Sequence, residues 1–255
     1  ADYLNTFTDS GALTRVVKSV TGQYYFVDGG KKYTFSSCDL VAQFGLDCAT
    51  AVQLTASQLA AFANGGSMTT YVPGDASSTY QIKDGVKHEI LDQASVQAAG
   101  LALPALNNVT INAFKKLPWG APIAKNNSLI TNRNTGAKAL ISNGKYYEIN
   151  ARTAADIDFS QWFGPTAGTL STDGVSVINA QTPIRAINTN SAGQSYLLGP
   201  LGKRPIENLD AFTPVAPNIA DTIFDVIPTA AEEKLTGPVL VRATGESAVY
   251  LVRSG

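Results

Sequence analysis

The sequence has little charge and no segment suited to a membrane or to a nucleic acid. Only 15% of its 255 residues are charged, well below the roughly 25% of ordinary globular domains. The net charge is −1, and no dense run of Lys or Arg supplies the basic patch that nucleic-acid binding needs. No apolar stretch approaches the roughly 18 residues of a transmembrane helix. These absences argue against nucleic-acid partners and membrane insertion, and the Gly, Ser, Thr and Asn in place of charge favour a β-rich extracellular protein.

The N-terminus, Ala-Asp-Tyr-Leu, lacks a basic region followed by an apolar one. We therefore expect that any signal peptide has been removed or lay on a longer parent chain.

Cysteine is scarce, with Cys38 and Cys48 separated by nine residues. This spacing fits no zinc pattern, because two further ligands would be needed. A loop of this length can close as a disulfide, which implies an oxidising compartment, and the alternative is a pair of buried free thiols. We predict the disulfide, and we expect it to fasten the outer segment of the first repeat without a redox role.

What the sequence does contain is a repeat of about 55 residues. Shifted by 55 residues, Leu4 falls on Leu59 and Phe7 falls on Phe62. Equivalent apolar positions recur in steps of 55, 55, 61 and 55, at Leu13, Met68, Ile123, Ile184 and Val239. The sequence thus predicts one repeat domain, 1–255, with units at approximately 13–67, 68–122, 123–183 and 184–238 and a partial unit, 239–255, completed by 1–12.

Each unit predicts three strands followed by helical and extended segments, in the order β-β-β-α-β-α. Alternating apolar residues and Asp-Gly or Asn-Gly turns are typical of antiparallel hairpins. Short helices are expected at 38–45 and 94–100, and second helices at 56–65, 112–120 and 229–237. A fourth strand is expected at 51–55, 108–112 and 221–227.

This composition of short strands and helices predicts a mainly β repeat protein. Our first interpretation is a five-bladed β-propeller-like ring with one abbreviated blade, because repetition around a ring protects sheet edges. The alternative is a linear array of small α+β repeats.

The repeat resembles one found in bacterial envelope and secreted proteins, with a core of the form VYLI-x-x-G-x-K-R-P-I. The matching stretches are AVYLVRSG (248–255), GKRPI (202–206), YYFVDGGKKYTF (24–35) and AVQLTASQL (51–59). Units two and three depart from it, since His88 and Tyr147 replace a basic residue. Such repeats resemble non-catalytic extensions of cell-wall hydrolases and surface-layer proteins. The resemblance implies an accessory role at the cell envelope and names no ligand.

The single histidine, His88, lies at a strand position that the other units fill with Tyr33, Tyr147 and Arg204. We interpret this position as a surface site of amphipathic residues, suited to cross-strand packing or to a ligand. No nucleophile and orienting acid recur around His88, so it is not predicted as a catalytic base.

Two tryptophans lie in connecting segments, where binding residues concentrate. Trp119 and Trp162 could each stack on a sugar ring or fill space between units. Asp156 and Asp158 form a D-x-D that could help to hold calcium or could cap a helix. The ligand-binding candidates are therefore Tyr33, His88, Tyr147, Arg204, Trp119 and Trp162, with no catalytic residue, metal ligand or cofactor predicted.

Together these observations predict a secreted or cell-surface, non-catalytic binding module for a cell-wall or other surface glycan. One alternative is a structural or adhesive envelope protein that binds other proteins or itself. A glycan-active enzyme is the least favoured, since it would need carboxylates that meet only in the fold.

Overall fold

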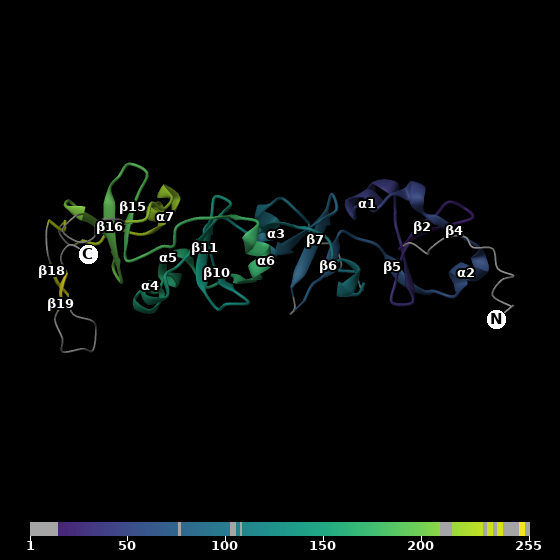
Figure 1. The fold of residues 1–255 in the computed structure, drawn as a ribbon, viewed down its shortest axis with the longest axis horizontal. Coiled ribbons are helices and arrows are strands. Elements are labelled where there is room, and N and C mark those ends of the chain that lie inside the picture. The colour runs from purple at the N-terminus through teal and green to yellow at the C-terminus, as the bar shows by residue number, and fades with distance from the viewer. Residues whose placement is uncertain are drawn as a thin grey trace. The chain divides into compact units, whose positions relative to one another are not determined.

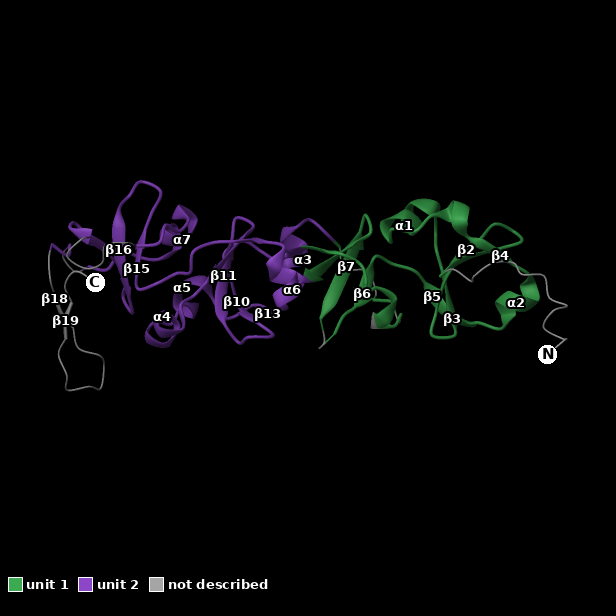
Figure 2. Ribbon diagram, viewed as in Figure 1, with its two compact units in different colours: residues 1–89, 102–120 green, residues 90–101, 121–255 purple. Residues whose placement is uncertain are grey.

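The computed structural model describes residues 15–75, 78–102, 106–107, 109–209, 216–231, 234–236, 239–241 and 250–252. Its strands and short helices follow one another along the chain (Figure 1). The chain divides into two compact units, 1–89 with 102–120 and 90–101 with 121–255 (Figure 2).

The first sheet is mixed, with an antiparallel centre and parallel edges. Its order is β4-β1-β2-β3-β5, in which β1, β2 and β3 are antiparallel, β4 is parallel to β1, and β5 is parallel to β3. The strands are β1 (Val16–Ser19), β2 (Tyr24–Asp28), β3 (Lys31–Thr34), β4 (Val52–Leu54) and β5 (Ala63–Ser67). Between them lie α1 (Cys38–Gln43), η2 (Cys48–Thr50) and α2 (Ala56–Ala60).

The third sheet in chain order has the same topology, β13-β10-β11-β12-β14, again with parallel edge strands. Its strands are β10 (Ser128–Asn132), β11 (Lys138–Ser142), β12 (Lys145–Glu148), β13 (Gly168–Leu170) and β14 (Asn179–Ala180). Its helices are α4 (Ala151–Asp156), α5 (Ser160–Phe163) and α6 (Thr172–Ser176).

The remaining sheets are smaller. One has the order β6-β7-β8-β9, formed by β6 (Tyr71–Pro73), β7 (Thr79–Lys83), β8 (Val86–Ile90) and β9 (Trp119–Ile123), with α3 (Gln93–Ala98) and η3 (Ile111–Ala113) between β8 and β9. Another contains β15 (Ile187–Thr189), β16 (Ser195–Gly199) and β17 (Gly202–Ile206), followed by α7 (Asp221–Val226). The last pairs β18 (Val239–Val241) with β19 (Tyr250–Val252).

The mainly β class with short helices is confirmed, whereas the five-bladed ring is not. The described residues form separate sheets and no closed barrel or propeller. The two five-stranded sheets carry parallel strands at both edges, whereas a propeller blade is a four-stranded sheet. The repeat boundaries and the single domain 1–255 stay predictions.

The predicted hairpin turns are present where Gly follows Asp, Asn or another Gly. Both central turn residues have positive φ, at Gly29–Gly30, Asp84–Gly85 and Asn143–Gly144. This geometry matches the twist of the flanking strands, and Asn, Asp and Gly tolerate it best. Local turn chemistry therefore sets the register of these hairpins.

Several predicted elements are corrected by the structure. The helices at 38–45, 94–100 and 56–65 and the strand at 51–55 are confirmed in shorter form. Residues 221–226 form α7 rather than a strand, and Ile227 is the C-cap of this helix, because Ile223, Phe224 and Ile227 follow helical spacing and are all buried. The described part of 108–112 contains a 3₁₀ turn, and within 229–237 the described Leu235 bridges to Ile206 in extended form.

A lysine on the third strand of a repeat donates hydrogen bonds to backbone carbonyls at the end of the second helical segment of that repeat, or just after it. Lys32 Nζ donates to the carbonyls of Leu59 and Phe62, at 2.8 Å each, where α2 ends. Lys87 Nζ donates to the Lys115 carbonyl at 2.8 Å, two residues beyond η3. The last carbonyls of a helix have no partner within it, and a nearby cation satisfies them and favours the negative end of the helix dipole.

The same interaction recurs in the fourth repeat and is absent from the third. Lys203 Nζ donates to the carbonyls of Phe224 and Ile227, the second at 2.8 Å, at the end of α7. Burial lowers the pKa of this ammonium group. In the third repeat Tyr146 takes the equivalent strand position, and its hydroxyl bonds Asn132 instead.

Hydrophobic clusters join elements of successive repeats. In the first unit, Phe114 stacks on Phe26 with ring centroids 5.4 Å apart and lies 5.2 Å from the Phe44 ring. In the second unit, one cluster combines strand residues of the third repeat with α7 of the fourth, including Leu140, Tyr147, Ile149, Ile223, Phe224 and Ile227. Within each of these two units, the earlier sheet is thus covered in part by elements of the next repeat.

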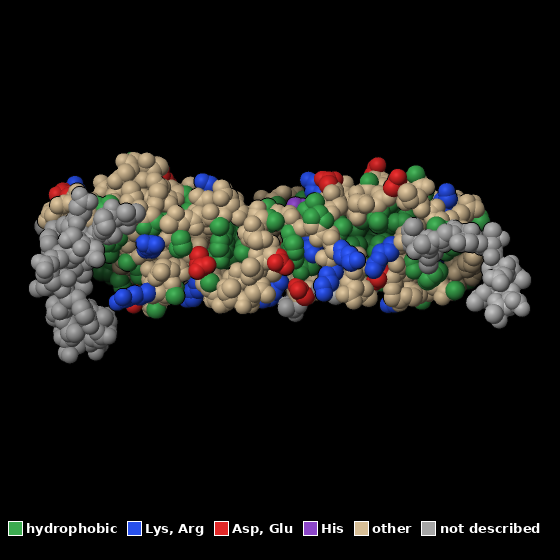
Figure 3. Space-filling view, viewed as in Figure 1, with side chains coloured by type: hydrophobic (Ala, Val, Ile, Leu, Met, Phe, Trp, Pro, Cys, Tyr) green, Lys and Arg blue, Asp and Glu red, His purple; other side chains and the backbone are tan. Residues whose placement is uncertain are grey.

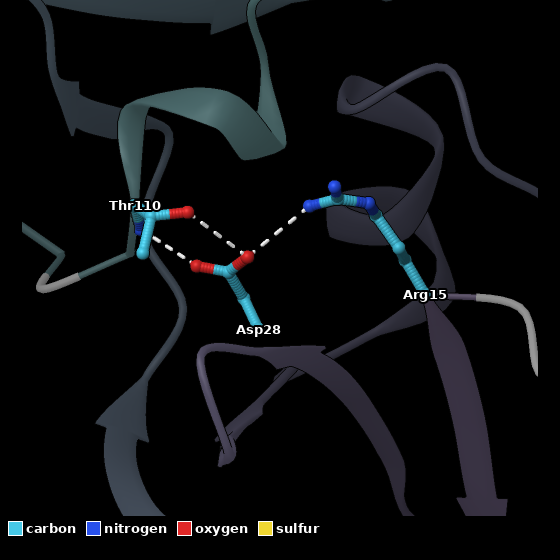
Figure 4. A network of polar contacts seen from close by, with 3 residues as sticks. All are labelled: Arg15, Asp28 and Thr110. Carbon is cyan, nitrogen blue, oxygen red and sulfur yellow. Dashed lines mark hydrogen bonds and ion pairs between the residues drawn. The ribbon is translucent and has the colours of Figure 1, made fainter.

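A group of polar contacts at the end of β2 reinforces this packing in the first unit. Asp28, the last residue of β2, accepts hydrogen bonds from the Thr110 backbone N–H at 2.6 Å and from the Thr110 hydroxyl at 3.1 Å (Figure 4). The Arg15 guanidinium lies 3.2 Å from the same carboxylate. These bonds connect the first hairpin to the segment that begins η3.

The predicted disulfide is confirmed. Cys38 and Cys48 are bonded, with Cα atoms 5.9 Å apart, and join the start of α1 to the start of η2. In the chain-entropy model, closing so short a loop stabilises the fold by about 2–3 kcal/mol. We expect reduction to lower the melting temperature of the first unit modestly without abolishing folding. Thiol titration of the unfolded, unreduced protein should find no reactive thiol, and two reactive thiols would contradict the bond.

The lysine that ends α7 predicts a stability effect. Substitution Lys203→Met keeps most of the apolar length but removes the ammonium donor. The Phe224 carbonyl keeps the Ile227 N–H at 3.1 Å, whereas the buried Ile227 carbonyl loses the one donor found for it in the described chain. A buried acceptor without a partner costs about 1–3 kcal/mol, so urea unfolding should show a loss in this range. The control is Lys145→Met, at an exposed position. Equal stabilities of the two variants would show that the interaction does not stabilise the helix end.

Candidate functional site

Two of the predicted ligand-binding residues are buried, which corrects the prediction of a surface position. Tyr33 is 1% exposed and Tyr147 is 2% exposed. Both lie on strands, β3 and β12, that are flanked by a parallel edge strand as well as by an antiparallel neighbour. The tyrosine rings therefore belong to the core, and burial raises the pKa of each phenol. Neither side chain presents a face to a ligand.

Each of the four equivalent strand residues lies on the sheet of its own repeat, on β3, β8, β12 and β17. His88 and Arg204 are half-buried. The His88 ring lies directly against the backbone of Gly120, where an added Cβ would approach its Cε1 to 2.3 Å. Their position is one of cross-strand packing, and ligand binding there stays a prediction.

The two tryptophans differ in their surroundings. Trp119 packs against the Tyr80 ring, with centroids 5.4 Å apart, and the Lys87 ammonium lies 4.2 Å from the centre of its ring. It therefore fills space beside the core of the first unit. Trp162, on α5, packs edge-to-face on Phe159 at 5.7 Å and remains half-buried, with part of its surface open.

Trp162 lines a hollow of about 370 Å³ in the second unit, which we call the Trp162 hollow. This volume lies at the small end of the range for small-molecule sites. Its apolar lining comes from Ala94, Leu129, Trp162, Phe163, Pro165, Ala167 and Val226. Its polar lining comes from Asp92, Lys125, Asn126, Asn127 and Ser128. A flat aromatic surface beside several hydrogen-bonding groups makes this hollow the best candidate for a binding site.

One end of the polar lining is held by the start of α3. Asp92 Oδ1 accepts a hydrogen bond from the Ser95 backbone N–H at 2.7 Å and so caps this helix. The Ser95 hydroxyl, on a residue only 1% exposed, accepts from the Lys125 backbone N–H at 2.9 Å. The Lys125 backbone is thereby fixed next to Asp92.

The other end is held by the third hairpin. Asn126 Oδ1 accepts from the Asn143 backbone N–H at 2.6 Å. The Ser142 hydroxyl donates to Asn127 Oδ1 at 2.8 Å and lies 2.9 Å from the Thr222 hydroxyl of α7. Segment 125–127 is therefore tied to three separate elements, which holds its side chains in place before any ligand arrives.

Sequence reasoning found Trp162 and missed the polar residues of the hollow. They come from the second and third repeats, and Val226 comes from the fourth, so no single motif contains them. One signal was present: Lys125-Asn126-Asn127 is a polar run in a segment where other units carry alternating apolar residues. Such a run marks a departure from the strand pattern and predicts a loop.

Metal chemistry finds no support in the described part of the chain. Among those residues, no group of three or more His, Cys, Asp or Glu side chains could hold an ion. Asp158 accepts hydrogen bonds from the Ser160 backbone N–H at 2.9 Å and from its hydroxyl at 2.7 Å, and these bonds lower the pKa of the carboxyl group. This carboxylate thus organises the start of α5.

None of the described helices is long and apolar enough to cross a membrane.

Comparisons with known proteins name no family for this chain. No protein-family model and no curated protein matches it. A solved structure of the periplasmic assembly from the ESX-5 inner membrane complex is 10% identical with a TM-score of 0.21, over 98% of this chain and 71% of that chain. An intact ESX-5 inner membrane complex is 12% identical with a TM-score of 0.22, over 99% of this chain and 63% of that chain. Likenesses at these TM-scores carry no argument about function.

The hydrogen bonds behind the hollow predict a cost for their removal. Ser142 is fully buried, so Ser142→Ala leaves Asn127 Oδ1 without its donor. We expect a loss of about 1–3 kcal/mol in the unfolding free energy of the second unit, measured with urea. The control is Ser36→Ala, at an exposed serine. An unchanged stability in Ser142→Ala would contradict a structural role for this network.

Proposed function

We propose that this chain is a non-catalytic, extracellular binding module that recognises a surface glycan at the Trp162 hollow. The observation that carries the proposal is the partly open indole of Trp162 next to Lys125 and Asn126. Aromatic rings offer a flat apolar face for a sugar ring, and the neighbouring polar groups supply hydrogen bonds to its hydroxyls. The hollow has room for a short oligosaccharide.

The extracellular location is supported by the disulfide between Cys38 and Cys48. Such bonds persist in oxidising compartments and are rare in the cytosol. The low charge of the chain agrees with this location, and on the face drawn in Figure 3 uncharged side chains and backbone cover most of the surface. The resemblance to bacterial envelope repeats points to the same setting.

A binding role is favoured over glycan hydrolysis because of the carboxylates available. Glycosidases act with a pair of carboxylates on either side of the bond that is cut. Among the residues that line the hollow, Asp92 is the only carboxylate, and it caps α3. The hollow therefore offers recognition without the acid and base that hydrolysis requires.

The test is binding of the whole chain to purified cell walls and to exopolysaccharide, measured by pull-down against an inert protein. We expect enrichment of the wild type and a roughly 5- to 150-fold weaker affinity for Trp162→Ala, since stacking of a planar group on an aromatic side chain contributes about 1–3 kcal/mol in nucleic-acid complexes. The matched control is Leu201→Ala, which removes a side chain 72% exposed and outside the hollow.

One further variant, Trp119→Phe, isolates the fluorescence of Trp162. In Trp119→Phe the only indole left is that of Trp162, so its fluorescence reports on the hollow alone. A shift of this fluorescence on adding soluble wall oligosaccharides supports the site. No enrichment of the wild type over the inert protein would remove the proposal, and self-association in sedimentation would then favour an adhesive role.

A further inference from the structure

The side chains of the Trp162 hollow leave an excess of hydrogen-bond donors for a ligand. Asn126 Oδ1 already accepts from the Asn143 backbone, and Asn127 Oδ1 accepts from Ser142. The Asn127 amide nitrogen donates to the Thr222 carbonyl at 3.4 Å. The side-chain amide oxygens of Asn126 and Asn127 are therefore each engaged by the protein, together with the amide donor of Asn127.

Apart from Asn127, three residues of the lining carry side-chain N–H groups that can only donate. Within the described chain, no hydrogen-bond or ion-pair partner is found for the Lys125 ammonium, the Asn126 amide nitrogen or the Trp162 indole N–H. Lys125 and Asn126 are exposed. A ligand that meets these groups must carry acceptors, and a negative charge is favoured by the ammonium group, which carries the only positive charge among the lining residues.

Asp92 provides an acceptor that can orient the ligand, and its negative charge does not cancel the preference for an anionic ligand. One of its oxygens is bonded by the Ser95 N–H at the start of α3, and the other can accept from a sugar hydroxyl. Lys125 and Asp92 are not an ion pair in the described chain. The two charges therefore offer separate contacts, the ammonium group to an anion and the carboxylate to a hydroxyl.

Resting on the function proposed above, we infer that the Trp162 hollow selects a glycan that bears a carboxylate, such as a uronic acid or a carboxyalkyl ether of a sugar. The Trp162 ring contacts the sugar face, the Lys125 ammonium pairs with the ligand carboxylate, and Asp92 accepts from a ring hydroxyl. Because segment 125–127 is already held by Ser95, Asn143 and Ser142, little ordering is needed when the ligand binds.

The experiment compares one wall preparation in two forms. Purified walls are stripped of peptide with an amidase, so that their remaining carboxylates belong to the glycan. Half of this material is treated with carbodiimide and methylamine, which converts carboxylates to neutral amides. We expect the wild type to bind the blocked glycan about three- to tenfold more weakly, and added salt to weaken binding to the untreated glycan more than to the blocked one.

Variants of Lys125 connect this selectivity to the hollow. Lys125→Gln should bind untreated glycan about as weakly as the wild type binds blocked glycan, while Lys125→Arg keeps the charge and the preference. The control is Lys145→Gln, at an exposed lysine of the same unit that does not line the hollow. Lys125 makes only a backbone hydrogen bond within the described chain, so this substitution should leave folding intact.

The outcomes distinguish this inference from the proposed function. Equal binding of both glycan forms, still lost in Trp162→Ala, would overturn the carboxylate preference and leave glycan binding in place. Unaltered binding by Lys125→Gln would likewise overturn it. If the wild type binds neither form, the proposed function fails and the inference fails with it.

Discussion

In the first, second and fourth repeats, a lysine ammonium of the third strand binds backbone carbonyls at or just after the end of a short helix. Helices of five or six residues, such as α2 and α7, leave most of their carbonyls without partners inside the helix. Lys32 and Lys203 donate to those carbonyls from the third strand of their own sheets. This interaction joins helix to sheet and gives a physical reason for the lysine in the repeat pattern.

The third repeat lacks this lysine and has a different hydrogen bond at the same strand position. Tyr146 replaces it and bonds Asn132 within the same sheet. The same repeat contains the longest step of the period, 61 residues, and this extra length includes α5 with Trp162. The repeat that departs furthest from the common pattern is therefore the one that supplies Trp162 and most of the other residues lining the hollow. Regular repeats supply the scaffold, and the irregular one supplies the candidate site.

The hollow also depends on contacts between repeats. Its polar segment is held by Ser95 from the second repeat, by Ser142 and Asn143 from the third, and by Thr222 from the fourth. A single isolated repeat could not reproduce this arrangement. Binding at this hollow would therefore require the repeats to pack on one another, which connects the hydrophobic clusters between neighbours to function.

The sequence by itself determined what local chemistry controls: the period, the Asp-Gly and Asn-Gly hairpins, the first helices and the disulfide of Cys38 with Cys48. It could not determine which side chains are buried. Tyr33 and Tyr147 looked like surface residues, yet strands distant in sequence pair beside β3 and β12 and the tyrosines enter the core. The sequence was interpreted as a fourth strand at 221–227, whereas residues 221–226 form α7 and bury apolar side chains. The Trp162 hollow likewise exists only once three repeats meet, because burial and convergence depend on contacts between distant residues and not on neighbours in the chain.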